Sequence, residues 1–203
     1  MTVPYPAPGG TSAFVRGDLP SLLRTALEVF GRHGFDAASM GDVAEHLGVT
    51  RGAVYYYVPS KGELLRLALE PALTALEVIP HQQGARLGTA FDRLLFVLRE
   101  MVMVLTNHAP AVAVLSSLRE NLAVEREAMS RQRAVEQEII NLVSLAIDDG
   151  ALRAGVDPDT AGRLLIGTLN SITDWYSHRG PITPSQLAED IISLTFTGLA
   201  PGF

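Results

Sequence analysis

Three helix-start signals follow one another between residues 39 and 63 of this chain. Ser39, Thr50 and Ser60 are each suited to cap a helix, and the first and third carry an acidic residue three positions further on, the spacing of a capping box. Gly48 precedes the second signal and permits a sharp turn, because glycine adopts left-handed backbone conformations at little cost. Two short helices joined by such a turn predict a helix-turn-helix, with a further helix directly after it.

The rest of the chain is punctuated as helices as well. Pro71 lies inside one predicted helix and is expected to kink it or to end it early. No run of alternating apolar and polar residues predicts a convincing strand, and no internal repeat is visible. The sequence therefore predicts an all-α fold of about nine helices. Outside the motif, the predicted helical stretches lie at about 19–33, 61–79, 85–106, 109–118, 122–148, 158–177 and 184–199.

Composition excludes several classes of protein. Hydrophobic residues make up 47% of the chain and charged residues 19%, so there is enough apolar surface for a core, and disorder is excluded for most of the chain. The chain contains no cysteine, which excludes disulfides and cysteine-ligated metal centres. Its formal charge of −6 is not that of a polybasic nucleic-acid binder.

Neither export nor membrane insertion is predicted. The first ten residues have neither a basic start nor an apolar run. The longest uncharged stretch, residues 101–118, has Asn107, His108 and Pro110 at its middle, where lipid would penalise them. We interpret this stretch as two buried segments that meet at a corner, and we expect a cytoplasmic protein that does not associate with a membrane.

The second helix of the motif has the composition that a major-groove reader needs. Gly52 and Ala53 are small and let the backbone approach the bases at the end of the helix that enters the groove first. Arg51 can reach a guanine edge or a phosphate, and Thr50 can bond a phosphate while it caps the helix. The segment therefore favours DNA binding.

Three of the five tyrosines of the chain follow directly, at 55–57. Their hydroxyls suit phosphate oxygens, and a ring can press on a thymine methyl. Lys61 lies at the start of the next helix, where backbone amides and the helix dipole favour an anion, so we expect it to clamp a phosphate. The candidate DNA-binding residues are Ser39, Thr50, Arg51, Gly52, Ala53, Tyr55, Tyr56, Tyr57 and Lys61.

The same segment also has a purely structural interpretation, as an ordinary helical corner whose tyrosines belong to the core. Three adjacent aromatics oppose that interpretation, because neighbours on a helix cannot all face inward. Charge opposes DNA binding, since residues 14–66 hold six basic and six acidic side chains. The residues leave open the alternative of a helical interaction protein without sequence-specific DNA binding.

Residues 22–69 closely resemble the DNA-binding domain of TetR-type (tetracycline-repressor-like) transcriptional regulators. The match rests on Phe30, on Gly34-Phe35, on Ala44 with Gly48-Val49, and on the Tyr-x-Tyr-x-x-Ser-Lys run that ends at Lys61. The resemblance implies a homodimer that binds a (pseudo)palindromic double-stranded DNA operator. It also implies a divergent C-terminal helical domain that dimerises and binds a small-molecule inducer.

The resemblance also implies roles for individual residues. By position, phosphate contacts fall to Thr50, Tyr56, Tyr57 and Lys61, and base-facing positions to Arg51, Gly52, Ala53 and Tyr55. One departure concerns the start of the first motif helix, where many relatives place a base-reading cation or polar residue and this chain has Gly41. Arg51 is therefore left as the main polar base reader.

Three segments are predicted along the chain. A flexible arm occupies residues 1–17, a helix-turn-helix DNA-binding domain residues 18–66, and a larger helical ligand-binding and dimerisation domain residues 67–203.

The last two predicted helices, at 158–177 and 184–199, are strongly apolar, with small residues such as Gly162 and Gly167 between the large ones. A solvent-facing helix does not need that composition, so we predict that this pair packs against its symmetry mate as a four-helix interface. The alternative is that the monomer's own core covers both faces.

The remaining helices, roughly 85–148, are expected to enclose an effector, although ordinary core is an alternative role for each apolar residue there. The candidate ligand-binding residues are Phe96, Met103, His108, Asn170, Asp174 and Trp175. The run from Asn170 through Trp175-Tyr176 to Gly180-Pro181 is similar to the C-terminal pattern of TetR-type regulators of fatty-acid or steroid breakdown. That similarity implies an acyl-CoA thioester as the small-molecule effector, the alternative being another small apolar ligand. We expect a repressor that its effector releases from DNA.

No enzymatic activity is predicted, and no catalytic residue, cofactor or metal is assigned. The chain lacks a nucleophile elbow, a P-loop, a dinucleotide fingerprint and a His-Glu-x-x-His zinc motif. Asp174 and His178 stand four residues apart, but two ligands do not make a metal site, and a surface ion pair is the simpler interpretation.

Overall fold

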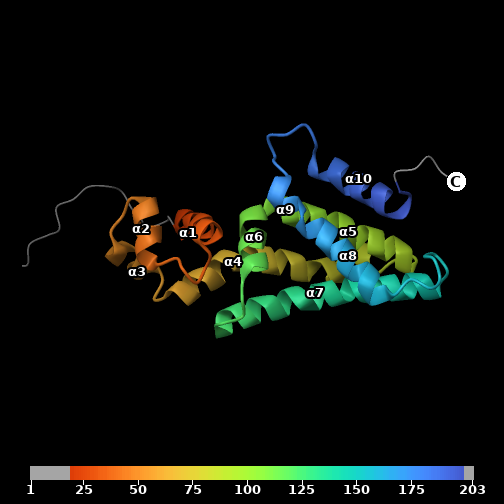
Figure 1. The fold of residues 1–203 in the computed structure, drawn as a ribbon, viewed down its shortest axis with the longest axis horizontal. Coiled ribbons are helices and arrows are strands. Elements are labelled where there is room, and N and C mark those ends of the chain that lie inside the picture. Colours follow the sequence, from red (N-terminus) through yellow and green to blue (C-terminus); the bar gives the residue numbers. More distant parts are fainter. Residues whose placement is uncertain (1–18, 199–203) are drawn as a thin grey trace, which may run out of the picture.

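The computed structural model describes residues 19–198, which form helices and no strands (Figure 1). The all-α prediction is therefore confirmed, while the predicted arm at 1–17 lies outside the described residues. The α-helices are α1 Leu19–His33, α2 Met40–Leu47, α3 Arg51–Tyr57, α4 Lys61–Val78, α5 Ala90–Asn107, α6 Ala109–Ser117, α7 Ala123–Asp148, α8 Pro158–Asn170, α9 Ile172–Trp175 and α10 Pro184–Phe196. Two short 3-10 turns, η1 Ile79–His81 and η2 Gln83–Ala85, connect α4 to α5.

The helices are divided between two ends of an elongated molecule (Figure 1). α1, α2 and α3 gather at one end, and α4 runs from them along the molecule. α5, α7 and α8 pack on one another at the other end, and α10 lies against α5. α6 packs on α1 and α4 and so belongs with the N-terminal helices in space, although it follows α5 in the chain.

Each end of the molecule has its own hydrophobic core. The N-terminal core is formed by buried side chains of α1–α4 up to Leu73, of α6, and of the start of α7 up to Ala128. The bundle core begins at Leu76 in α4 and at Val135 in α7, and includes α5, α8, α9 and α10. The cores thus meet part-way along α4 and α7, and the helix-turn-helix shares its core with α6.

The structure agrees with the predicted extent of the helix at 61–79 and corrects the predicted start of the next helix. α4 does not end at Pro71 but continues through it, and the proline lies on the exposed face of the helix. α5 starts at Ala90 rather than near residue 85, because Thr89 and Asp92 cap one another's backbone amides in a capping box. The pKa of Asp92 is lowered by its hydrogen bonds to Thr89, most of all by the bond from the Thr89 hydroxyl and then by that from the Thr89 amide.

The predicted helix at 158–177 is interrupted. α8 ends at Asn170, Ser171 forms a turn, and the short α9 ends at Trp175, after which Tyr176 has extended backbone. Among residues 19–198, no helix combines the length and the apolar character needed to cross a bilayer. The uncharged stretch at 101–118 is a corner between α5 and α6, as predicted.

Gly162 lets α8 approach α7 closely. A methyl group at this position would lie 2.5 Å from Cγ1 and 3.2 Å from Cα of Ile140, so its smallness is required by packing within one chain. We expect Gly162→Ala to lower the free energy of unfolding by about 1–3 kcal/mol through overpacking. Urea denaturation measures this. As a matched control, Gly31→Ala places its methyl group 4.0 Å from Val114 and should be neutral or mildly stabilising; equal effects of both changes would contradict the packing argument.

Candidate DNA-binding surface and effector groove

The motif helices begin where the capping residues predict. The Ser39 hydroxyl accepts a hydrogen bond from the Asp42 amide at 3.2 Å, and the Asp42 carboxylate accepts one from the Ser39 amide at 2.7 Å. The second of these bonds is the main reason that the pKa of Asp42 is lowered. Because a carboxylate already occupies the N-terminus of α2, that end offers little to a phosphate.

The turn between α2 and α3 has the predicted geometry. Gly48 lies in the left-handed region with φ of 72° and ends α2. Thr50 then caps α3, its hydroxyl accepting a hydrogen bond from the Ala53 amide at 3.3 Å. No acidic residue stands in the first turn of α3, so its free amides and positive dipole end remain available to an anion.

α3 is anchored by one side chain and exposes most of the others. Val54 is fully buried in the N-terminal core, where it packs with Val43 and Ala44 of α2. Arg51, Gly52, Tyr55 and Tyr56 are exposed, and Ala53 is half-buried. Val54 is the one fully buried side chain of this seven-residue helix, and with the half-buried Tyr57 it fixes which face points outward.

The structure brings Arg51 and Tyr55 together on the exposed face. The Arg51 guanidinium donates a hydrogen bond to the Tyr55 hydroxyl at 3.3 Å and lies 5.5 Å from the centre of its ring. Tyr56 is 71% exposed and meets the half-buried Tyr57 edge-on, with ring centres 5.4 Å apart. The tyrosines therefore divide, with Tyr57 packed against the N-terminal core and the other two directed outward.

Lys61 has a different environment from the one expected. Its ammonium donates to the carbonyl oxygens of Phe35, Asp36 and Ala38 at 2.7, 3.1 and 2.9 Å, and lies 4.5 Å from the centre of the Phe35 ring. These bonds use all three protons of the ammonium group. Lys61 thus pins the turn between α1 and α2 to the start of α4, and a phosphate contact by this side chain would require these bonds to break.

The candidate ligand-binding residues are not gathered at one place. The Phe96 ring lies on the backbone of η2, where a methyl group at Gly84 would come within 2.3 Å of it. His108 is half-buried at the corner between α5 and α6, and Met103 is half-buried on α5. Their positions are those of packing and capping residues.

Asn170 borders a small internal cavity, whereas Asp174 and Trp175 are exposed. The cavity lies between α4, α5, α6, α7 and α8 and measures about 10 Å³, room for at most one water molecule. The Oε1 atom of Gln132, which borders it, is buried without a hydrogen-bond partner among the described residues. Residues 19–198 contain no cluster of three or more acidic or histidine side chains that could hold a metal ion.

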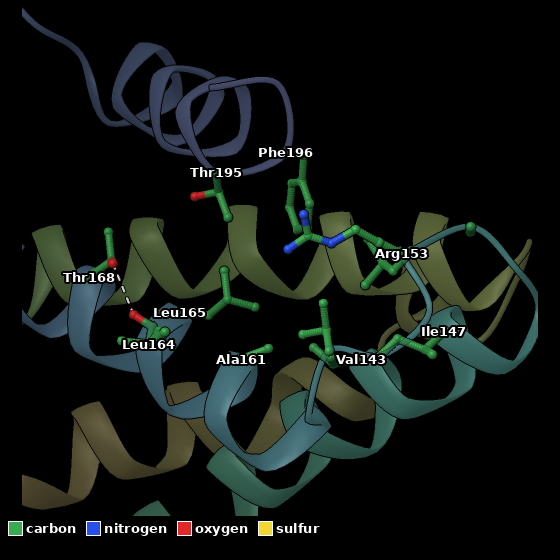
Figure 2. Close-up of a pocket in the computed structure, with 12 residues that line it drawn as sticks. Val143, Ile147, Arg153, Ala161, Leu164, Leu165, Thr168, Thr195 and Phe196 are labelled. Carbon is green, nitrogen blue, oxygen red and sulfur yellow. Dashed lines mark hydrogen bonds between the residues drawn. The ribbon is translucent and has the colours of Figure 1, made fainter. Parts of the chain in front are cut away.

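A roomier apolar groove lies where the ends of α7, α8 and α10 meet (Figure 2). Its volume is about 530 Å³, and the guanidinium of Arg153 lies over it between Phe196 and the α7 side chains. None of the candidate ligand-binding residues lines it. The lining residues are Val143, Ile147, Ala151, Leu152, Arg153, Val156, Ala161, Leu164, Leu165, Thr168, Thr195 and Phe196.

Sequence reasoning missed this groove because its walls come from three separate helices and the loop before α8. The one local signal was Arg153, a cation flanked by small and apolar residues in that loop.

A helix-turn-helix with an outward-facing second helix, joined to a helical bundle with a groove, defines a DNA-binding regulator with a sensor domain. Comparison with known proteins identifies the family of regulators. Residues 22–68 match the family model for bacterial regulatory proteins of the tetR family, and residues 87–199 match the model for the tetracyclin repressor-like C-terminal domain. The chain belongs to the TetR family of DNA-binding transcriptional regulators, which are not enzymes.

Similar proteins support this assignment over 88–96% of the chain. A TetR-family regulator from Streptomyces coelicolor A3 has 35% sequence identity and a TM-score of 0.83, covering 89% of this chain and 91% of that one. The transcriptional repressor KstR2 of Rhodococcus jostii is 23% identical over 96% of this chain and 97% of its own. The structure of AibR in complex with isovaleryl coenzyme A and operator DNA has the same fold, with a TM-score of 0.70 at 19% identity over 88% of this chain and 97% of that one.

Proposed function

We propose that this protein is a homodimeric repressor that binds a palindromic operator and is released by an amphiphilic anion such as an acyl-CoA thioester. The observation that carries the proposal is the presentation of α3: Val54 is fully buried, while Arg51 and Tyr55 pair on the opposite, exposed face. A helix held in this way can enter a major groove with its N-terminal residues at the base edges. Repression is favoured by the similarity to KstR2.

The two C-terminal helices supply the surface for a dimer. Leu164 and Trp175 are 68% and 57% exposed, and Leu194 of α10 is 48% exposed. On the same side of α8 as Leu164, a methyl group at Gly167 would meet no atom within 4 Å. Exposed apolar residues on α8, α9 and α10 favour an interface, and a self-complementary one gives the two-fold symmetry that a palindrome requires.

The groove at the end of the bundle supplies the chemistry for the effector. Its walls are apolar, and Arg153 has no hydrogen bond or ion pair to another side chain within residues 19–198. An unpaired guanidinium beside an apolar cavity favours a ligand with a hydrocarbon body and an anionic group. AibR was crystallised with isovaleryl coenzyme A, a ligand of that description.

Fluorescence anisotropy with DNA from upstream of the protein's own gene tests the proposal. We expect binding that is tighter than to unrelated DNA, weakens as salt rises, and is reversed by an acyl-CoA but not by free coenzyme A. Equal, weak binding to both DNAs, followed by failure to enrich any sequence from a random library, would contradict sequence-specific binding. If no acyl-CoA reverses the binding, acyl-CoA thioesters are excluded as the effector, while the proposal of a DNA-binding repressor stands.

Arg153 should control the response to the effector rather than DNA binding. We expect Arg153→Gln to raise the acyl-CoA concentration needed for release about 10- to 100-fold, because a hydrogen bond to a charged group contributes about 1.5–3 kcal/mol. Anisotropy titration of the preformed DNA complex measures it. Arg179→Gln removes an exposed arginine that does not line the groove and should leave the midpoint unchanged. Equal midpoints for both variants would place the effector elsewhere.

A further inference from the structure

The boundary between the two cores crosses α4 and α7 at the same level. In α4, Leu73 belongs to the N-terminal core and Leu76 to the bundle core. In α7, Ala128 belongs to the first and Val135 to the second. The buried stripe of α4 passes from one core to the other without a gap, whereas α7 has no buried residue between Ala128 and Val135. Polar contacts between α4 and α7 at this level therefore add to the apolar packing that fixes the angle between the two ends of the molecule.

α4 also has its weakest backbone point beside this boundary. Pro71 has no amide hydrogen, so the carbonyl of Leu67 lacks the hydrogen bond that an α-helix normally supplies. A proline inside a helix also crowds the preceding turn, which is why helices bend at such positions. α4 connects the helix-turn-helix to the bundle, so a bend at Pro71 changes the direction in which α3 points.

One side chain bridges this weak point from outside. Arg131 of α7 donates two hydrogen bonds to the Glu77 carboxylate, at 2.6 and 2.7 Å, and two to the Glu70 carboxylate, at 2.9 and 3.1 Å. Glu70 precedes Pro71 and Glu77 follows it, two helical turns apart on the same face of α4. The rigid fork of the guanidinium suits such a doubly bidentate contact, whereas a lysine would not hold both carboxylates in plane.

The neighbouring charges strengthen the bridge. The Arg131 side chain is only 23% exposed, and its hydrogen bonds lower the pKa of both carboxyl groups and raise the pKa of the guanidinium. Glu70 also accepts a hydrogen bond from Thr74 at 3.0 Å and lies 4.0 Å from the guanidinium of Arg66. The carboxylate before the proline is thus held from α4 itself as well as from α7.

We propose that Arg131, through Glu70 and Glu77, splints α4 across Pro71 and sets the orientation of the DNA-binding end relative to the bundle. Arg131 is a positioning residue in this scheme, since it lies on α7 outside the helix-turn-helix and does not line the groove. The link from orientation to operator affinity rests on the proposed function. The splint itself can be measured without DNA or effector, so its failure is distinguishable from a failure of the proposed function.

The chain contains no cysteine, so two introduced cysteines can be spin-labelled selectively. Glu45→Cys on α2 and Asn141→Cys on α7 place the labels at exposed positions on either side of the boundary. Double electron–electron resonance then gives the distribution of the distance between the two labels, which reports how much the orientation of the two ends varies. Excess unlabelled protein suppresses distances between protomers. We expect Arg131→Gln to widen the distance distribution about twofold as minor orientations become populated.

Two further variants separate a splint from a general loss of stability. Pro71→Ala restores the missing backbone hydrogen bond, so Pro71→Ala/Arg131→Gln should return to the narrow distribution of the parent. Arg99→Gln breaks another doubly hydrogen-bonded contact between helices, that of Arg99 with Glu189, but entirely within the bundle, and should leave the distribution unchanged. If Arg131→Gln does not fold, Glu77→Gln removes only the contact beyond the proline and should give a smaller widening.

Operator affinity supplies the functional measurement. If the fraction of molecules in the binding orientation falls to about one tenth, the apparent Kd of Arg131→Gln rises about tenfold, and the Pro71→Ala double variant recovers it. An unchanged distance distribution in Arg131→Gln would overturn the proposal. So would a widened distribution that Pro71→Ala does not narrow, because the bridge would then stabilise α4 and α7 without acting at the proline.

Discussion

Gly167→Glu is expected to leave each protomer folded and to abolish tight operator binding. A Cβ atom at this exposed position would meet no atom within 4 Å in the protomer, so the change should not strain the monomer, and replacing a helical glycine should favour α8. In the proposed dimer the same position faces the partner, where a buried carboxylate without a counter-charge is strongly unfavourable. We therefore expect the protein to become monomeric in sedimentation experiments.

The loss of affinity follows from the loss of the second half-site. Two linked recognition helices bind a palindrome more tightly than one by roughly 10²- to 10⁴-fold, because the second contact is intramolecular. Gly167→Glu should lose most of that factor in anisotropy titrations, while binding to a single half-site stays as it was. Ala134→Glu adds the same charge at an exposed position of α7 and should remain dimeric. A dimeric Gly167→Glu variant with normal operator affinity would exclude α8 from the interface.

The helix starts were predictable from sequence because each depends on a few neighbouring residues. Ser39, Thr50 and Ser60 cap α2, α3 and α4 as expected, with the hydroxyl of each accepting an amide hydrogen bond three residues on. The ends of helices were less predictable, as the interruption of the helix predicted at 158–177 shows. The turn is at Ser171, where no glycine or proline signals the end of a helix. The short α9 that follows packs against α5 and α6, and this tertiary packing stabilises the turn.

The candidate DNA-binding surface was predictable for the same reason, since its residues lie within one short helix. Lys61 was the exception. Its carbonyl partners lie 23 to 26 residues earlier in the chain, and only the folded turn after α1 brings them together. The groove between α7, α8 and α10 was harder still to predict, because Val143, Leu164 and Phe196 come from three helices whose packing no local pattern specifies.

The neutral charge of the DNA-binding end also acquires a physical interpretation. Several of its charges are used within the fold: Lys61 on backbone carbonyls, Asp42 on the start of α2, and Glu63 with Arg66. These are two basic and two acidic groups, so the overall balance stays neutral, but the charge is unevenly placed: α3 carries the cation Arg51 and no acidic residue. Sequence-specific contacts, rather than a broad basic field, should supply most of the discrimination between DNA sequences.

Arg51→Ala is accordingly expected to relax base preference at one position of each half-site by about 1–3 kcal/mol. A guanidinium can donate two hydrogen bonds to the O6 and N7 atoms of guanine, and Tyr55 already holds it on the exposed face of α3. Competition between operators that differ at single base pairs measures the effect. Affinity for unrelated DNA should fall much less, because only one charge is lost per protomer.

Arg51→Lys separates the geometry of this contact from its charge. Lysine keeps the positive charge but lacks the planar fork, so it should preserve affinity for unrelated DNA and still lose much of the base preference. If both variants discriminate between operators as the parent does, Arg51 is a phosphate contact and the bases are read by Tyr55 or by backbone and methyl contacts at Gly52 and Ala53. If only Arg51→Ala loses discrimination, a point charge at this position is sufficient, and the paired arrangement with Tyr55 does not contribute to recognition.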